Sequence, residues 1–214
     1  RTKVKIMKLE VINEAYPVRE VTDFNLPEVE LEWPEENTEV SKSKLAINRL
    51  RIPTSLDDNI PQHKKFAKQW DKHTQQIHEY LCKDKAFEEA PELTSAWPRG
   101  FENLKWPQAS NHISTIELLK DKPDFFMTPH IDNREVIGVL IINLQDNNPG
   151  SGTTFHDRPY GKNTENIWWE GPTKKHSGVF IINNWNTWHS IKNFGAEDRF
   201  IAYQTLNIIN FFRG

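Results

Sequence analysis

The chain has 214 residues, of which 36% are hydrophobic and 27% are charged, and its formal net charge is −3. This length predicts a single domain, residues 1–214, with enough apolar material for a continuous core, and the near-neutral charge gives no electrostatic reason to expect a nucleic acid partner. No stretch approaches the roughly 18 apolar residues of a membrane span, and no signal-peptide segment is present, so we expect no membrane partner. Cys82 is the only cysteine, which excludes an intrachain disulfide and favours a reducing compartment, with the cytoplasm as the default expectation.

Residues 1–110 combine one strand pattern, a long irregular stretch and one helix. Apolar and charged residues alternate over residues 4–12, which predicts a strand with one solvent-facing side. Residues 13–59 are rich in acids and interrupted by prolines, so we expect mostly irregular structure with a short strand at residues 46–50. The acidic run at residues 28–39 is most simply a solvated face.

The clearest helix pattern covers residues 64–82. Its apolar and aromatic positions recur at steps of three and four residues: Phe66, Trp70, His73, Ile77 and Leu81. Lysine, glutamine and glutamate lie between them, so the pattern predicts an amphipathic helix. His73 and His78 belong to this helix and are interpreted as structural or solvent-facing.

From residue 111 onward the pattern changes to short strands separated by turn signals. Proline, glycine and asparagine clusters mark the turns, and residues 150–155, Gly-Ser-Gly-Thr-Thr-Phe, predict a tight turn leading into a strand. The predicted strands cover residues 113–119, 125–129, 136–144, 153–156, 179–183, 190–193 and 199–209. So many short strands in about a hundred residues predict a mainly β sandwich or closed β-structure.

Three potential metal ligands stand out within this part of the chain. His130 and Asp132 are two residues apart at a strand end, where an extended backbone turns both side chains to the same side. His189 begins a later strand pattern. Two histidines and one carboxylate, with other coordination positions open, form the facial triad that suits non-haem Fe(II). Each histidine alone is more simply an ordinary buried or rim residue.

Arg199 follows His189 by ten residues and adds an anion-binding group. A hairpin turning at residues 193–198 would place both on adjacent antiparallel strands with a shared face. A guanidinium grips a carboxylate through two parallel hydrogen bonds, so Arg199 is expected to hold the far carboxylate of a dicarboxylic cosubstrate. Strand alternation puts Ile201 and Tyr203 on the same face, lining that pocket, although Tyr203 could equally be a core aromatic. The alternative for Arg199 is a surface ion pair with Glu197 or Asp198.

The order and spacing of these four residues, over residues 113–209, resemble the 2-oxoglutarate- and Fe(II)-dependent oxygenase superfamily, in particular its prolyl-hydroxylase-like members. The resemblance implies a double-stranded β-helix, or jelly-roll barrel, at residues 111–214, with residues 1–110 as N-terminal supporting elements. It implies Fe(II) held by His130, Asp132 and His189, and 2-oxoglutarate and O2 as cosubstrates. It also implies hydroxylation of an unactivated C–H bond with release of succinate and CO2. Asn143 stands where the family carries a tyrosine that binds the same distal carboxylate.

The substrate is not identified by the sequence, and we expect a small molecule or a peptidyl group. Segments flanking the expected opening supply the candidate substrate contacts: Asn111, Arg134, Arg158, and the adjacent tryptophans Trp168 and Trp169 on a presumed loop. The tryptophans could also be plain core at the barrel end. Two other functions remain open at this point, namely a cupin-like Zn or Mn enzyme that uses no 2-oxoacid, and a non-catalytic jelly-roll binding module.

Overall fold

The computed structural model describes residues 7–13, 16–33, 49–52, 59–81, 116–132, 136–157, 166–183 and 186–207. Within these ranges one helix and eleven strands form. In chain order they are β1 (Lys8–Val11), β2 (Val18–Thr22), β3 (Arg49–Ile52), α1 (Pro61–Leu81), β4 (Glu117–Asp121), β5 (Phe125–His130), β6 (Val136–Asn143), β7 (Thr153–His156), β8 (Ile167–Glu170), β9 (Gly178–Ile182), β10 (His189–Asn193) and β11 (Arg199–Asn207).

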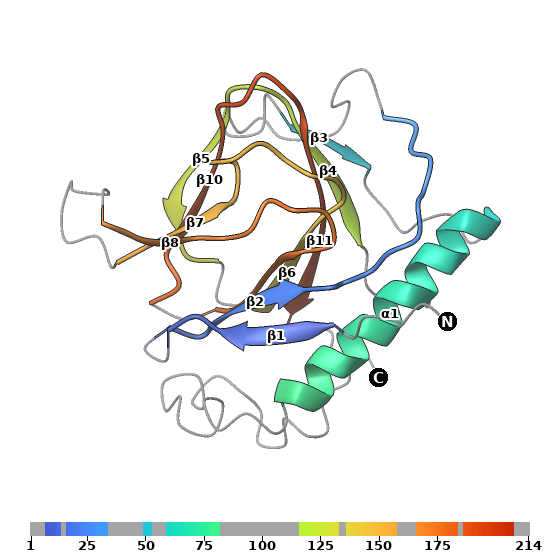
Figure 1. Cartoon of the computed structure of the whole chain (residues 1–214), viewed down its shortest axis with the longest axis horizontal. Coiled ribbons are helices and arrows are strands. Elements are labelled where there is room, and N and C mark those ends of the chain that lie inside the picture. Colours follow the sequence, from blue (N-terminus) through green and yellow to red (C-terminus); the bar gives the residue numbers. More distant parts are fainter. Residues whose placement is uncertain are drawn as a thin grey trace.

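The strands make two antiparallel sheets that face each other (Figure 1). The larger sheet has the order β1-β2-β9-β6-β11-β4-β3, and the smaller sheet has the order β5-β10-β7-β8. From β4 onward the chain passes back and forth between the sheets, so strands distant in sequence become neighbours. This arrangement is a double-stranded β-helix, and it confirms the fold class that the sequence predicted. The first three strands extend the larger sheet at its two edges.

Two apolar clusters fill the molecule, one on each face of the larger sheet. The inner cluster lies between the sheets and includes Ile141, Ile181 and Ile201 from the larger sheet and Phe155 from the smaller one. The outer cluster lies between the larger sheet and α1. Because β6 is buried on both faces, it is an almost continuous apolar run rather than an alternating one.

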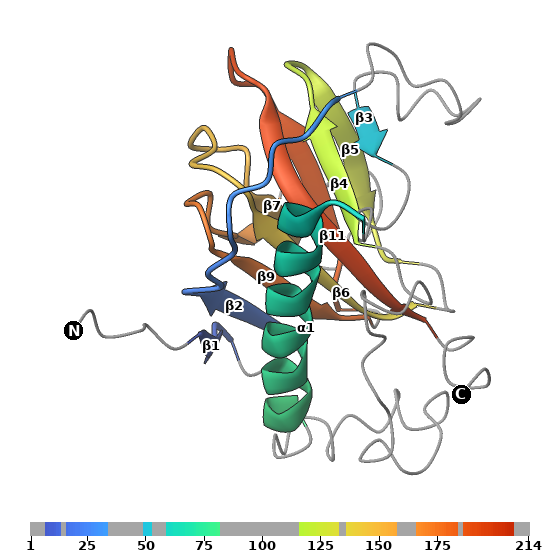
Figure 2. The same ribbon diagram turned by 90° about the vertical axis from the view of Figure 1, so that its right-hand side faces the viewer.

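Helix α1 covers the outer face of the larger sheet (Figure 2). Its buried stripe includes Phe66, Trp70 and Ile77, and the Trp70 Nε1 donates a 2.7 Å hydrogen bond to Gln204 Oε1 in β11. The predicted helix is confirmed; it begins earlier, at Pro61, a residue well suited to the first helical turn. Residue 82 lies outside the described ranges. Among the described residues, no helix has the length and apolar character needed to cross a membrane.

The N-terminal half contains more strand than the sequence predicted. Strand β2 lies in a segment expected to be irregular, and it pairs with β9. Its Val18 enters the inner cluster and its Val21 the outer one, so it shows no simple alternation of apolar and polar residues.

Two other strands differ from the sequence prediction. Strand β8, in the C-terminal half, was not predicted, and β3 begins at Arg49, near the end of the strand predicted at residues 46–50. Residues 46–48, like residues 4–6, lie outside the described ranges.

Candidate metal centre

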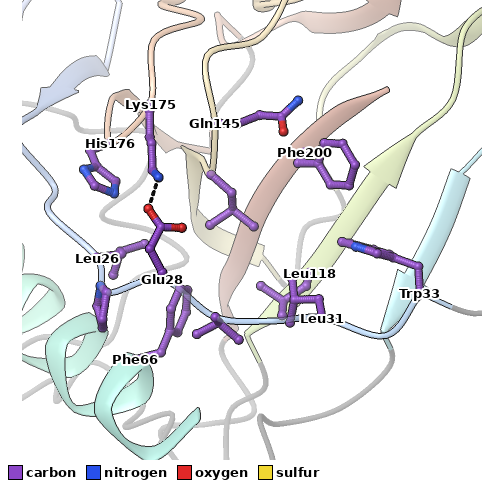
Figure 3. A pocket seen from close by; sticks show the side chains of 13 residues that line it. Leu26, Glu28, Leu31, Trp33, Phe66, Leu118, Gln145, Lys175, His176 and Phe200 are labelled. Carbon is purple, nitrogen blue, oxygen red and sulfur yellow. Dashed lines mark hydrogen bonds and ion pairs between the residues drawn. The ribbon is translucent and has the colours of Figure 1, made fainter. Parts of the chain in front are cut away.

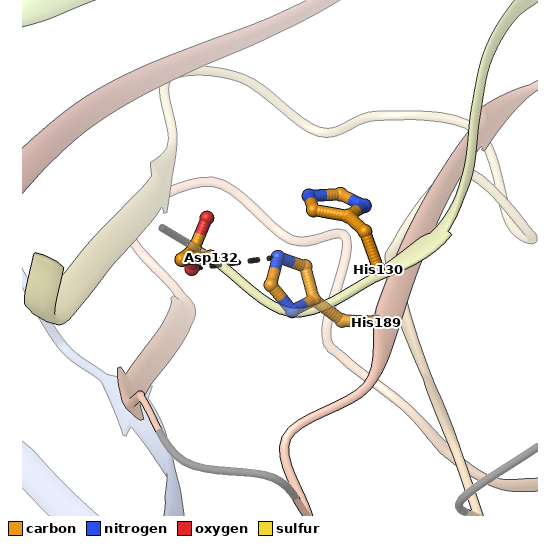
Figure 4. A group of neighbouring side chains, drawn as sticks. All are labelled: His130, Asp132 and His189. Carbon is orange, nitrogen blue, oxygen red and sulfur yellow. Dashed lines mark ion pairs between the residues drawn. The ribbon is translucent and has the colours of Figure 1, made fainter. Parts of the chain in front are cut away.

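Two neighbouring strands of the smaller sheet bring the three predicted ligands together. His130 ends β5, His189 begins β10, and the two residues are direct partners in the antiparallel pairing of these strands. Asp132 follows β5 by two residues and turns toward the histidines (Figure 4). One potential ligand atom from each residue lies within 4.8 Å of those of the other two. The pairing shifts register between His189 and Ile191, and such bulges commonly re-aim side chains at sites of this kind.

A hydrogen bond to a nearby backbone carbonyl orients each of the two imidazoles. His130 Nδ1 lies 2.8 Å from the Thr128 carbonyl oxygen, and His189 Nδ1 lies 2.8 Å from the Thr187 carbonyl oxygen. A carbonyl only accepts, so each Nδ1 must carry a proton and donate it, which makes Nε2 the ring nitrogen that can bind a metal. In both cases the acceptor is the carbonyl two residues upstream, and each histidine sits in a Thr-x-His sequence that could have signalled it.

The charges of the site favour a bound cation. Asp132 Oδ2 is buried and has no hydrogen-bond donor among the described residues, and His189 Nε2 lies 3.8 Å away from it. A carboxylate oxygen in that position needs a positive partner. Burial lowers the pKa of His189, the Asp132 carboxylate opposes that shift, and His130 adds to it. His189 is therefore held in the neutral form that binds metals. Two imidazoles and one carboxylate fit a divalent transition metal.

A residue that sequence reasoning missed supports the carboxylate ligand from behind. The side-chain amide of Asn183, just after β9, donates to the carbonyl oxygens of Asp132 at 3.2 Å and Val136 at 2.8 Å. It thereby ties the backbone of the ligand loop to the larger sheet. No spacing rule links residue 183 to residue 132, because the contact depends on the way β9 lies beside β6.

The predicted hairpin between His189 and Arg199 is wrong. Strand β10 belongs to the smaller sheet and β11 to the larger one, so the two strands are not hydrogen-bonded to each other. Both edges of β10 are already occupied, by β5 and β7, and the chain must cross the end of the barrel instead. Asn193 fastens that crossing, since its side-chain amide donates to the carbonyl oxygens of Asp121 and Glu197.

Arg199 is buried with a partner that the sequence did not indicate. Its Nη1 lies 2.8 Å from Asp121 Oδ2, and Arg49 grips the same carboxylate through Nε at 2.5 Å and Nη2 at 2.9 Å. The expected alternative, an ion pair with Glu197 or Asp198, does not form, and Asp198 pairs with Lys120 instead. Burial lowers the pKa of Arg199, Asp121 raises it and Arg49 lowers it, although a guanidinium stays protonated under all ordinary conditions.

The other expected cosubstrate residues have different surroundings. Ile201 is fully buried in the inner cluster and Tyr203 packs against it, on the face that strand alternation predicted. Asn143 uses both amide hydrogens on the carbonyl oxygens of Pro172 and Ser177, at 2.7 and 3.0 Å. Its Oδ1 accepts from Asn147. Asn143 therefore has no amide hydrogen left for a cosubstrate carboxylate in this structure.

The expected substrate contacts are only partly described. Trp168 and Trp169 were predicted on a loop, but they lie on strand β8 at the edge of the smaller sheet. Both pack against the inner cluster, and Trp168 stacks on Tyr16 with ring centroids 4.2 Å apart. This placement agrees with the alternative interpretation of the pair as core. Three residues lie outside the described ranges: Asn111, Arg134 and Arg158.

A cavity of about 360 Å³ lies elsewhere, on the helix-covered side of the larger sheet (Figure 3). Its apolar wall includes Phe66, Leu118 and Phe200, and an ion pair between Lys175 and Glu28 lies at its polar end. Phe66 and Leu118 belong to the outer cluster, whereas the metal ligands lie on the smaller sheet. The cavity is therefore separate from the candidate metal centre.

The comparisons with known proteins give matches among solved structures only. No family model and no curated protein matches the chain significantly. One similar solved structure is an oxidoreductase of the 2OG-Fe(II) oxygenase family from Burkholderia pseudomallei, with 17% identity and a TM-score of 0.33 over 42% of each chain. Another is a prolyl hydroxylase from Trichoplax adhaerens in complex with a hypoxia inducible factor oxygen degradation domain peptide fragment. It shows 12% identity and a TM-score of 0.47, over 82% of this chain and 71% of that one. The chain thus spans less than half of the first of these proteins, and the function proposed below rests on the site geometry.

Proposed function

We propose that the protein is an Fe(II)- and 2-oxoglutarate-dependent dioxygenase that hydroxylates an unactivated C–H bond. The observation that carries the proposal is the convergence of His130 and Asp132 with His189, which lies far away in the sequence; one ligand atom of each residue lies within 4.8 Å of those of the other two. Three protein ligands of this type leave coordination positions free for a cosubstrate and dioxygen. A structural zinc site, in contrast, is closed by four protein ligands.

Each ligand has a defined task in this proposal. The two imidazoles present Nε2 because the Thr128 and Thr187 carbonyls fix their Nδ1 protons. Asp132 supplies the negative charge and the oxygen ligand. When bound, Fe(II) with 2-oxoglutarate and O2 supplies the oxidising power that converts C–H to C–OH, while 2-oxoglutarate becomes succinate and CO2. The protein contributes placement and exclusion of water, and no side chain has to act as a general acid or base.

Arg199 is proposed to receive the distal carboxylate of 2-oxoglutarate. Its Nε is buried without a hydrogen-bond partner among the described residues, and a carboxylate is the ligand that best satisfies a guanidinium edge. Ile201 and Tyr203 share the face of Arg199 and are proposed to line this end of the pocket. Asn143 is not included, because its amide hydrogens are already used.

The proposed substrate is a small molecule or a peptidyl side chain, since a net charge of −3 provides no electrostatic attraction for nucleic acid. A reducing, cytoplasmic compartment is proposed from the single cysteine.

The test measures succinate formed from 2-oxoglutarate by the purified protein with Fe(II) in air, across a panel of peptides, amino acids and small metabolites. We expect slow succinate formation without substrate, faster formation with the right substrate, and none in Asp132→Ala. An anaerobic visible absorption band on mixing Fe(II) and 2-oxoglutarate gives a second readout. Metal binding without any 2-oxoglutarate binding would favour a cupin-like Zn or Mn enzyme, and no metal binding at all would favour a binding module.

A further inference from the structure

We propose that Arg49 and Asp121, on strands β3 and β4, set the orientation of Arg199 and the degree to which its charge is neutralised, and so make the site select a 2-oxoacid with a charged tail. This inference rests on the proposed function. In it Arg49 and Asp121 are positioning residues that act through Arg199. Arg49 belongs to the N-terminal part of the chain, to which the sequence assigned only a supporting role.

The three charged residues form one row across neighbouring strands. Asp121 is the direct pairing partner of Arg199 on one side and of Arg49 on the other. Its carboxylate is fully buried and accepts hydrogen bonds from both guanidinium groups. Arg49 also lies over the ring of Phe125, with its Cζ 4.2 Å from the ring centroid, a contact that holds a cation in place.

The Asp121 carboxylate is shared between two guanidinium groups. Arg49 and Arg199 together face the single carboxylate of Asp121, whose oxygens both lie against Arg49. Asp121 is therefore shared, and the buried Arg199 is not fully neutralised. A ligand carboxylate would give the buried Arg199 a second anionic partner, whereas an uncharged tail would leave its charge beside the shared Asp121 carboxylate, which is costly.

Asp121 also determines which edge of Arg199 stays open. It contacts Nη1 only, and the buried Nε has no partner among the described residues. The edge formed by Nε and Nη2 is one of the two that can bind a carboxylate through parallel hydrogen bonds. With Nη1 fixed, Arg199 cannot turn this edge away from its present direction without losing its ion pair.

The experiment compares binding of 2-oxoglutarate with binding of 2-oxopentanoate, which has the same chain length and an uncharged tail. Binding is measured by titration calorimetry with Mn²⁺ in place of Fe(II), so that no turnover occurs. In Arg49→Met, Asp121 is left to neutralise Arg199 alone, and we expect 2-oxoglutarate affinity to fall about tenfold, the effect of removing one nearby unit charge in a partly buried site. The affinity for 2-oxopentanoate should stay within about twofold.

Two further variants separate charge from general damage. Arg49→Lys keeps the positive charge and should retain most of the preference for 2-oxoglutarate. Arg19→Met removes a different buried arginine, from β2, and should leave the preference unchanged. Thermal melts in the presence of Mn²⁺ identify any variant that fails to fold.

The outcomes distinguish this inference from the proposed function. If the wild-type protein binds neither 2-oxoacid, the proposed function fails. If it prefers 2-oxoglutarate and folded Arg49→Met keeps the same preference, or loses affinity equally for both ligands, the role of Arg49 is refuted while the proposed function stands. The same holds if Arg49→Lys behaves like Arg49→Met.

Discussion

Asp132→Asn provides a test of the metal centre that needs no knowledge of the substrate. The variant keeps the size of the side chain but removes its charge. Without metal, Asp132 Oδ2 is buried, has no hydrogen-bond donor among the described residues, and lies 3.8 Å from His189 Nε2. An isolated buried charge of this kind does not stabilise the fold. We therefore expect metal-free Asp132→Asn to be as stable as the wild type, within about 1 kcal/mol, or more stable.

The effect should appear when metal is added. A metal present at a hundred times its Kd stabilises the folded state by about 2.7 kcal/mol. For a chain of this size, each kcal/mol corresponds to about 2–4 °C in Tm, so the wild type should gain about 5–11 °C. If loss of the carboxylate weakens metal binding about a hundredfold, the gain at the same metal concentration falls to about 0.4 kcal/mol. That corresponds to about 1–2 °C.

The assay is thermal unfolding of both proteins, each after chelation and each with Mn²⁺ added in the absence of oxygen. The difference between the two metal-induced shifts is the measured quantity, which removes any effect of the substitution on the metal-free fold. A metal-induced shift of equal size in both proteins would remove Asp132 from the ligand set. A large loss of stability in the metal-free variant would show that the carboxylate has a structural partner instead.

Two further predictions concern the stability of the fold. Gly152→Ala should lower the free energy of unfolding, measured in urea, by about 1–3 kcal/mol, because the new Cβ would lie 2.2 Å from the Gly171 carbonyl oxygen. Gly150→Ala is the control: its Cβ would meet no atom within 4 Å, but its φ is +80°. It should lower the free energy of unfolding by only about 1–2 kcal/mol. Burial lowers the pKa of His73, so the unfolded chain takes up the proton more readily, and the free energy of unfolding should fall as pH drops below about 6.5. This dependence should weaken in His73→Gln, and an unchanged slope between pH 7 and 5 would contradict the assignment.

The sequence predicted the parts of the site that depend on local geometry. His130 and Asp132 share a side because they are two residues apart at the end of a strand, and the predicted strand ended within one residue of the observed one. Helix α1 could also be predicted from the sequence, since its buried residues repeat at the helical period. Strand β2 was not, because both of its faces are buried and its apolar residues therefore follow no single period.

The charged row of Arg49, Asp121 and Arg199 could not be predicted from the sequence, for a different reason. Its members are separated by 72 and 78 residues, and they meet only because three strands from distant segments adopt one particular register. A shift of one residue in either pairing would turn a charged side chain to the opposite face of the sheet. The predicted hairpin failed on the same point, because spacing alone does not reveal that both edges of β10 are occupied. The resulting geometry still leaves Arg199 facing the interior of the barrel. Asp121 holds it there, and Arg49 binds the same carboxylate, although the strand pattern gave no reason to connect these three residues.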